Sequence, residues 1–199
     1  MMFNKAFGGF LFLMCLVLVS VLGCYQVIVP ASTGKSETRE PTSSKPELKI
    51  FRHVHTTLSE EDADTILKVA TDVAQSNPGC NVTLTRDGDV KEFKWPQEAD
   101  VGVVSSKHDF DKVTNSRGVK VVKDVQWCET LGPFWGCARI PGTAMVVERI
   151  QDKDSEGILW LHEYGHTQGL YDLYDDSQEN NVLFHIIGPD HKRFSPNEC

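Results

Sequence analysis

The spacing of apolar and polar residues predicts alternating strands and helices. Residues 48–57 (LKIFRHVHTT) alternate in polarity and predict a strand. An apolar stripe at helical spacing follows Ser59 and stops at Pro78 and Gly79, which predicts a helix with its end there. Ser59 and Asp62 have the spacing of a capping box, so Ser59 is the expected N-cap.

The rest of the chain predicts further strands and a second helix. Asp154 is the expected cap of that helix, which runs through SEGILWLHEYGHTQ. This order of elements predicts an α+β domain with a mixed sheet. The further strands are expected at residues 80–86, 90–95, 100–105, 119–128 and 138–150.

The first 23 residues have the pattern of an export signal. Lys5 precedes an apolar run over residues 10–22, which is too short for a comfortable membrane span and suits a signal peptide at 1–23. The run ends in VLGC, which resembles a bacterial lipobox with Cys24 as the lipid-modified residue. We therefore expect a cell-envelope protein anchored to a bacterial membrane through Cys24. The alternative is a secreted protein in which Cys24 is incidental.

Composition divides the remaining chain into a tether and one domain. Residues 24–47 are rich in Ser, Thr, Pro and charge, so they are expected to form a flexible tether. Residues 48–199 are long enough to bury a core. The formal net charge of −8 argues against nucleic acid as a partner and against electrostatic binding to an anionic membrane surface.

The cysteines predict disulfides, as expected of an exported domain. Cys15 would leave with the signal. Cys128 and Cys137 bracket a short loop and are expected to pair, and Cys80 with Cys199 would then form a long-range bond. Four cysteines allow three connectivities, and all three remain open at this point.

The second predicted helix carries the sequence HEYGH. His162 and His166 are four residues apart, so they lie on one face of a helix and can bind the same metal ion. Glu163 is placed to contact a water on that metal and to act as general base. Zn²⁺ is the expected ion because catalytic zinc takes three protein ligands and keeps one position for water.

The third ligand is expected shortly after the helix. Gly169 suits a left-handed residue that ends a helix, so the chain can turn back there. Asp172 follows at a spacing that brings it to the metal. His185 and His191 are alternative third ligands, because both lie downstream.

The string HEYGHTQGLYD resembles the signature of the metzincin metalloproteases, HExxHxxGxxH, with Asp172 at the last ligand position. Small snapalysin-like proteases are similar in using Asp there. The resemblance implies a zinc endopeptidase of zincin-like fold, with a twisted mixed sheet and an active-site helix. It also implies that substrate binds as an added strand near residues 143–150.

The sequence departs from this pattern beneath the expected metal. Leu183 stands where metzincins have a methionine, and its similar volume would let it form the floor of the site. Asp172 adds negative charge, which would leave the bound water less acidic than three imidazoles would. Of the other candidates, His53 and His55 are expected on an exposed strand face, and Tyr171 and Tyr174 are expected to pack.

We therefore expect a zinc endopeptidase that acts on proteins or peptides. One rival function is a surface lipoprotein that binds a partner and holds zinc structurally. Another is a zinc amidase that acts on cell-wall material. The tether has no cysteine besides Cys24 that could cap the zinc, so we expect an enzyme without a latency device or one that depends on a separate protein inhibitor.

Overall fold

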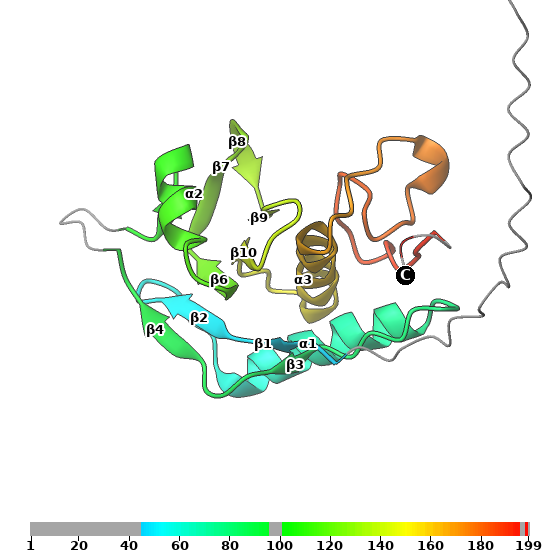
Figure 1. The fold of residues 1–199 in the computed structure, drawn as a ribbon, viewed down its shortest axis with the longest axis horizontal. Coiled ribbons are helices and arrows are strands. Elements are labelled where there is room, and N and C mark those ends of the chain that lie inside the picture. Colours follow the sequence, from blue (N-terminus) through cyan, green and yellow to red (C-terminus); the bar gives the residue numbers. More distant parts are fainter. Residues whose placement is uncertain (1–44, 96–100, 196–197, 199) are drawn as a thin grey trace, which may run out of the picture. The chain divides into compact units, whose positions relative to one another are not determined.

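The computed structural model describes residues 45–95, 101–195 and 198, all within the compact unit Arg39–Cys199 (Figure 1). The predicted signal peptide, Cys24 and the tether up to residue 44 lie outside these residues. No helix within the described part of the chain is long and apolar enough to cross a membrane.

A five-stranded mixed sheet forms the centre of the fold. Four of its strands are parallel, and the edge strand β9 runs antiparallel to β10, so the predicted mixed α/β fold is confirmed at this level. The strands, in spatial order, are β4 (Lys91–Phe93), β2 (Ile50–His53), β6 (Gly118–Val122), β10 (Ala144–Glu148) and β9 (Gly136–Ala138).

Two helices pack together on one face of this sheet (Figure 1). Helix α1 (Glu60–Gln75) begins as predicted, since the Ser59 side chain accepts a hydrogen bond from the Asp62 amide at 3.0 Å. Helix α3 (Lys153–Thr167) has Asp152 as its N-cap, so the prediction of Asp154 was wrong. The Asp152 carboxylate accepts from the Ser155 amide at 2.8 Å, whereas Asp154 lies in the first turn.

Several predicted strands were too long, because short turns and irregular segments divide or shorten them. Residues 48–57 contain the end of β1 (Glu47–Leu48) and all of β2. Among the named strands, residues 80–86 contain β3 (Thr85–Arg86), which pairs with β1. Residues 138–150 contain the end of β9 and all of β10, separated by a turn with a cis Ile140–Pro141 bond.

A smaller sheet was only partly predicted. Residues 119–128 divide at Lys123 into β6 and β7 (Asp124–Cys128), which belong to different sheets. β7 lies between β5 (Val103–Val104) and β8 (Thr130–Phe134). The sequence had suggested a loop for β8, because Gly and Pro disfavour strands. Helix α2 (Lys107–Val113) was also missed, since its seven residues show only a short apolar pattern.

The predicted bond between Cys128 and Cys137 is present and joins the end of β7 to β9. Cys80 is buried and disulfide-bonded. Cys199 lies outside the described residues, so its pairing with Cys80 stays a prediction.

The chain after α3 is irregular but well anchored. It contains one short 3₁₀ helix, η1 (Asp176–Gln178), and a bridge between Leu173 and Phe184. The side chain of Asn77, just beyond α1, donates to the Lys192 carbonyl at 2.8 Å and accepts from the Phe194 amide at 2.9 Å. These two hydrogen bonds hold the C-terminal segment against the end of α1.

Candidate metal centre

Helix α3 carries three polar side chains into the interior. His162, Glu163 and His166 are each no more than 5% exposed, although they lie among apolar residues of a helix that is buried on nearly all sides. Burying polar and ionisable groups is costly unless they are paired or bind a metal. Their burial therefore points to a site rather than to a solvated helix face.

Gly169 turns the chain back toward the helix, as predicted. Its φ of +95° lies in the left-handed region. The Leu170 amide donates to the Gly165 carbonyl and the Gly169 amide to the His166 carbonyl, which is the Schellman pattern of helix termination. Asp172 is thereby brought back to the two histidines.

The structure brings the three predicted ligands together. Asp172 Oδ1 lies 3.4 Å from Nε2 of His162 and 3.4 Å from Nε2 of His166, and the two Nε2 atoms are 2.9 Å apart. Tetrahedral zinc with bonds of about 2.0–2.1 Å would separate its ligand atoms by roughly 3.3–3.5 Å. Both distances to Asp172 match that value, and the histidine pair is slightly closer.

Hydrogen bonds fix which nitrogen of each imidazole faces the centre. Nδ1 of His162 lies 2.8 Å from the Val182 carbonyl, and Nδ1 of His166 lies 2.9 Å from the Leu170 carbonyl. A carbonyl only accepts, so each Nδ1 carries the proton, and in the neutral ring Nε2 has a free lone pair. Two lone pairs and a carboxylate converging on one point are favourable only around a cation, so these residues fit a metal ion.

The carboxylate at this centre also favours positive charge. Burial opposes ionisation of Asp172. When the two imidazoles carry protons in place of a metal ion, however, hydrogen bonds from His162 and His166 outweigh burial and hold the pKa of that carboxyl well below its usual range. Burial likewise lowers the pKa of His166, but Asp172 and Glu163 outweigh it and raise the pKa to about 9. The site therefore stabilises a cation.

Glu163 is buried with one oxygen free. Its Oε2 has no hydrogen-bond partner among the described residues, and burial raises the pKa of its carboxyl. A Cβ at Gly136 in β9 would lie only 2.3 Å from Glu163 Oε1, so only glycine allows the strand to come this close. Sequence reasoning missed Gly136, because nothing in the string FWGC marks it as part of the site.

Leu183 lies beneath the helix, where the sequence suggested a floor. It is 1% exposed, and a Cβ at Gly165 would lie 2.8 Å from its Cδ2 atom. The Asn181 side chain accepts from the Leu183 amide at 2.7 Å. This bond also positions the neighbouring Val182 carbonyl, which holds His162.

The alternative ligands lie outside the cluster. Among described residues, the group able to hold a metal consists of His162, His166 and Asp172. His185 is exposed and stacks on Tyr174, with ring centroids 4.9 Å apart, and His191 packs edge-on against Phe184.

Two lesser predictions were wrong. His53 is fully buried beside Trp95, with ring centroids 4.8 Å apart, although His55 is exposed as expected. Tyr171 and Tyr174 are 68% and 71% exposed rather than packed. Tyr174 borders the site, where the charge of Asp172 raises the pKa of its hydroxyl.

The cluster lies in a cleft of about 550 Å³, with β9 along one side. The prediction that residues 143–150 border the cleft was wrong, because β10 lies inside the sheet and β9 forms the edge. No lysine or arginine is among the residues that line the cleft. They are mostly apolar away from the metal ligands, including Pro133, Phe134, Trp135, Ile140, Ile186 and Ile187.

The fold is similar to that of archaemetzincin, and other solved structures resemble it less. Archaemetzincin from Methanopyrus kandleri is 18% identical, with a TM-score of 0.51 over 76% of this chain and 91% of that chain. A zinc-dependent peptidase from Methanocorpusculum labreanum is 12% identical, with a TM-score of 0.46 over 75% and 96% of the two chains. Metalloproteinase-II from Bacteroides fragilis is 14% identical, with a TM-score of 0.48 over 81% and 53%.

The likeness to archaemetzincin shows the fold. The sequence matched no protein-family model and no curated protein. For this chain, the chemistry rests on its own residues.

Proposed function

We propose that this chain is a zinc-dependent endopeptidase of metzincin type. His162, His166 and Asp172 would hold the ion, and Glu163 would be the general base. The observation that carries the proposal is the meeting of two imidazole lone pairs and one carboxylate beside a buried glutamate with a free oxygen. The similarity in fold to archaemetzincin supports it.

Zinc, when bound, supplies the Lewis acidity that makes a water nucleophilic near neutral pH. Glu163 accepts the proton of the attacking water and returns it to the amine that leaves. Burial raises the pKa of the Glu163 carboxyl, which favours uptake of a proton from water. The Val182 and Leu170 carbonyls hold the imidazoles in the tautomer that binds metal.

We propose that the peptide substrate binds along β9 as an added strand. β9 is an edge of the central sheet, and Gly136 and Ala138 line the cleft. An edge strand offers unpaired amide and carbonyl groups to an extended peptide. A peptide bound in this way would have its scissile bond near Glu163, because Gly136 of β9 lies directly beside that side chain.

We further propose that the enzyme is exported and anchored through lipid on Cys24, with residues 24–47 as tether. A disulfide between Cys128 and Cys137 is consistent with an oxidising compartment. A separate protein inhibitor remains the proposed means of control. Labelling with a radioactive fatty acid, lost in a Cys24→Ser variant, tests the anchor.

The test of the enzyme joins metal content to cleavage. We expect one zinc per chain and digestion of casein or mixed peptides that a chelator abolishes. Glu163→Gln should keep the zinc and lose the cleavage. Zinc without cleavage of any substrate would favour the non-catalytic lipoprotein, and cleavage of peptidoglycan fragments alone would favour the amidase.

A further inference from the structure

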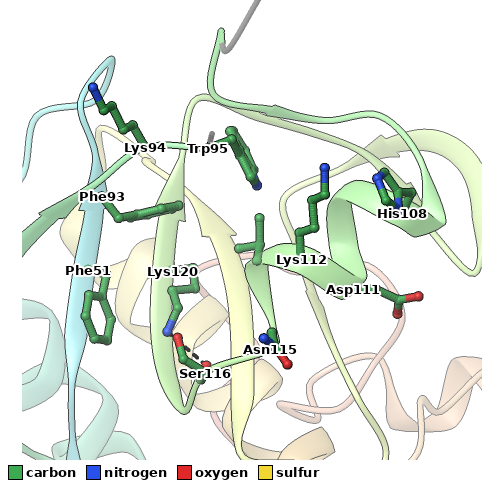
Figure 2. A pocket seen from close by; sticks show the side chains of 11 residues that line it. Phe51, Phe93, Lys94, Trp95, His108, Asp111, Lys112, Asn115, Ser116 and Lys120 are labelled. Carbon is green, nitrogen blue, oxygen red and sulfur yellow. Dashed lines mark hydrogen bonds between the residues drawn. The ribbon is translucent and has the colours of Figure 1, made fainter. Parts of the chain in front are cut away.

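A second cavity lies on the face of the central sheet that is turned away from α1 and α3 (Figure 2). Val119 and Val121 of β6 pack in the cluster with these helices, so Lys120 between them points to the opposite face. The cavity measures about 480 Å³, which is within the range of small-molecule sites. It shares no lining residue with the cleft at the metal centre.

Aromatic rings line this cavity. Phe93 and Trp95 meet edge to face, with centroids 5.9 Å apart, and Phe51 lies beside Lys120 (Figure 2). Flat apolar surfaces of this kind favour a planar hydrophobic group, which can stack on one ring and meet the edge of another.

A buried amine adds a positive charge to these apolar walls. Lys120 is only 3% exposed, and its Nζ donates to the carbonyls of Ser116 and Arg117 at 3.0 and 2.8 Å. The ammonium also lies 4.0 Å from the centre of the Phe51 ring. Burial lowers the pKa of Lys120 to about 8, and no carboxylate pairs with it in the part of the chain that the structure describes.

The surroundings of Lys120 are cationic as well. Lys94 and Lys112 also line the cavity. Asp111 is the carboxylate among the lining residues, and it already pairs with Lys107 at 2.6 Å and with Arg139 at 2.5 Å. The chain as a whole has a formal charge of −8, so it would repel an anionic polymer. The local positive charge of the cavity would still attract a small anion.

We propose that this cavity binds a small aromatic carboxylate. Its ring would lie against the aromatic walls formed by Phe93, Trp95 and Phe51. Its carboxylate would approach the amine of Lys120, with Lys112 as a further positive charge in the cavity. The anion supplies the counter-charge that Lys120 lacks, and the rings supply apolar contact. The site is separate from the metal centre, so the inference does not depend on the proposed peptidase activity.

Three ligands with one ring system test the proposal on the full-length chain. Indole-3-acetate carries the carboxylate, indole-3-acetamide is neutral and tryptamine is a cation. Isothermal titration calorimetry should show a Kd for the acid on the order of 1 mM or tighter. The amide should bind about tenfold more weakly, because it lacks a charge-assisted hydrogen bond, and tryptamine should not bind.

Variants locate the binding. Lys112→Met should weaken binding of the acid about three- to tenfold, and Lys120→Met should remove the preference for acid over amide. Lys68→Met, an exposed lysine of α1, is the matched control and should change nothing. Circular dichroism spectra should show that Lys120→Met is folded. If it is not, the affinity of Lys112→Met for the acid tests the proposal instead.

Three results would overturn the proposal. One is equal binding of acid and amide, and another is no binding at millimolar concentration. The third is binding that a chelator abolishes and Lys112→Met leaves unchanged, because the acid would then be bound at the metal centre. In that last case, Lys120 serves only to hold the turn after α2.

Discussion

At the scale of single residues, Gly136 sets the position of Glu163. We expect Gly136→Ala to lower kcat/KM by more than about 100-fold, since a displacement of about 1 Å at a reacting group can cost that much. Zinc content should not change, because the atoms nearest to a Cβ at position 136 belong to Glu163 and not to the proposed ligands. Peptide cleavage and metal analysis on the same preparation check this. Gly132→Ala in β8 should remain active, because the atoms nearest to the new Cβ belong to the Phe134 ring and not to Glu163.

Glu148 is the residue with the clearest effect on pH-dependent stability. Burial raises the pKa of its carboxyl to about 7, and the neighbouring Asp124 adds to the rise, although the Val125 amide donates to it. A raised pKa in the folded state favours the protonated form. The free energy of unfolding should therefore fall by about 1–2 kcal/mol as pH rises from about 4.5 to 7, allowing for the partial exposure of Glu148.

Urea unfolding at several pH values tests this expectation. Glu148→Gln keeps an oxygen that can accept from the Val125 amide, so it should flatten the dependence between pH 4.5 and 7. An unchanged slope in the variant would assign the pH dependence to other groups.

At the scale of elements, the start of α3 depends on its cap. Asp152→Ala should lower the free energy of unfolding by about 1 kcal/mol, because the Ser155 amide would lose its acceptor. Asp154→Ala removes only a favourable charge in the first turn and should cost about 0.5 kcal/mol or less. Paired urea titrations check the order, and a larger loss in Asp154→Ala would contradict the observed cap.

The disulfide between Cys128 and Cys137 joins two elements that border the cleft, β7 and β9. Replacing both cysteines with alanine should lower the free energy of unfolding by about 2–3 kcal/mol, the usual value for a loop of this length. Activity should fall as well, since Gly136 adjoins Cys137 and would be less firmly held against Glu163. Thermal unfolding and peptide cleavage measure the two effects, and full activity would show that β9 keeps its place without the bond.

The elements also show what could be predicted from sequence. Helix α1 was predicted well because its stripe, cap and stop signals agree, and the turn at Gly169 was predicted because a left-handed residue has a clear preference for glycine. The strands were less predictable, since β6 and β7 follow each other without a Gly or Pro turn signal, and Lys123 alone divides them between two sheets. The contact of Gly136 with Glu163 depends on tertiary packing, which leaves no local pattern.

At the scale of the whole molecule, the proposed metal joins α3 to the segment that follows it. Zinc removal should therefore lower the melting temperature and loosen residues 170–184, because metal binding to the folded state adds to stability. Differential scanning calorimetry with and without a chelator measures the first effect, and hydrogen exchange measures the second. Zinc added back in excess over the chelator should restore both, and an unchanged melting temperature would argue against a bound ion.

The spacing of the ligands has a consequence for the order of folding. Asp172 is only ten residues from His162, and the Val182 carbonyl that holds His162 comes soon after. Closing loops this short costs little chain entropy. The metal centre can therefore form before the strands of the sheet, which are far apart in the sequence, have paired. Strand β9, which brings Gly136 to Glu163, comes from farther away along the chain. The chain can thus capture its metal early, and the approach of Gly136 to Glu163 is the late step that completes the site.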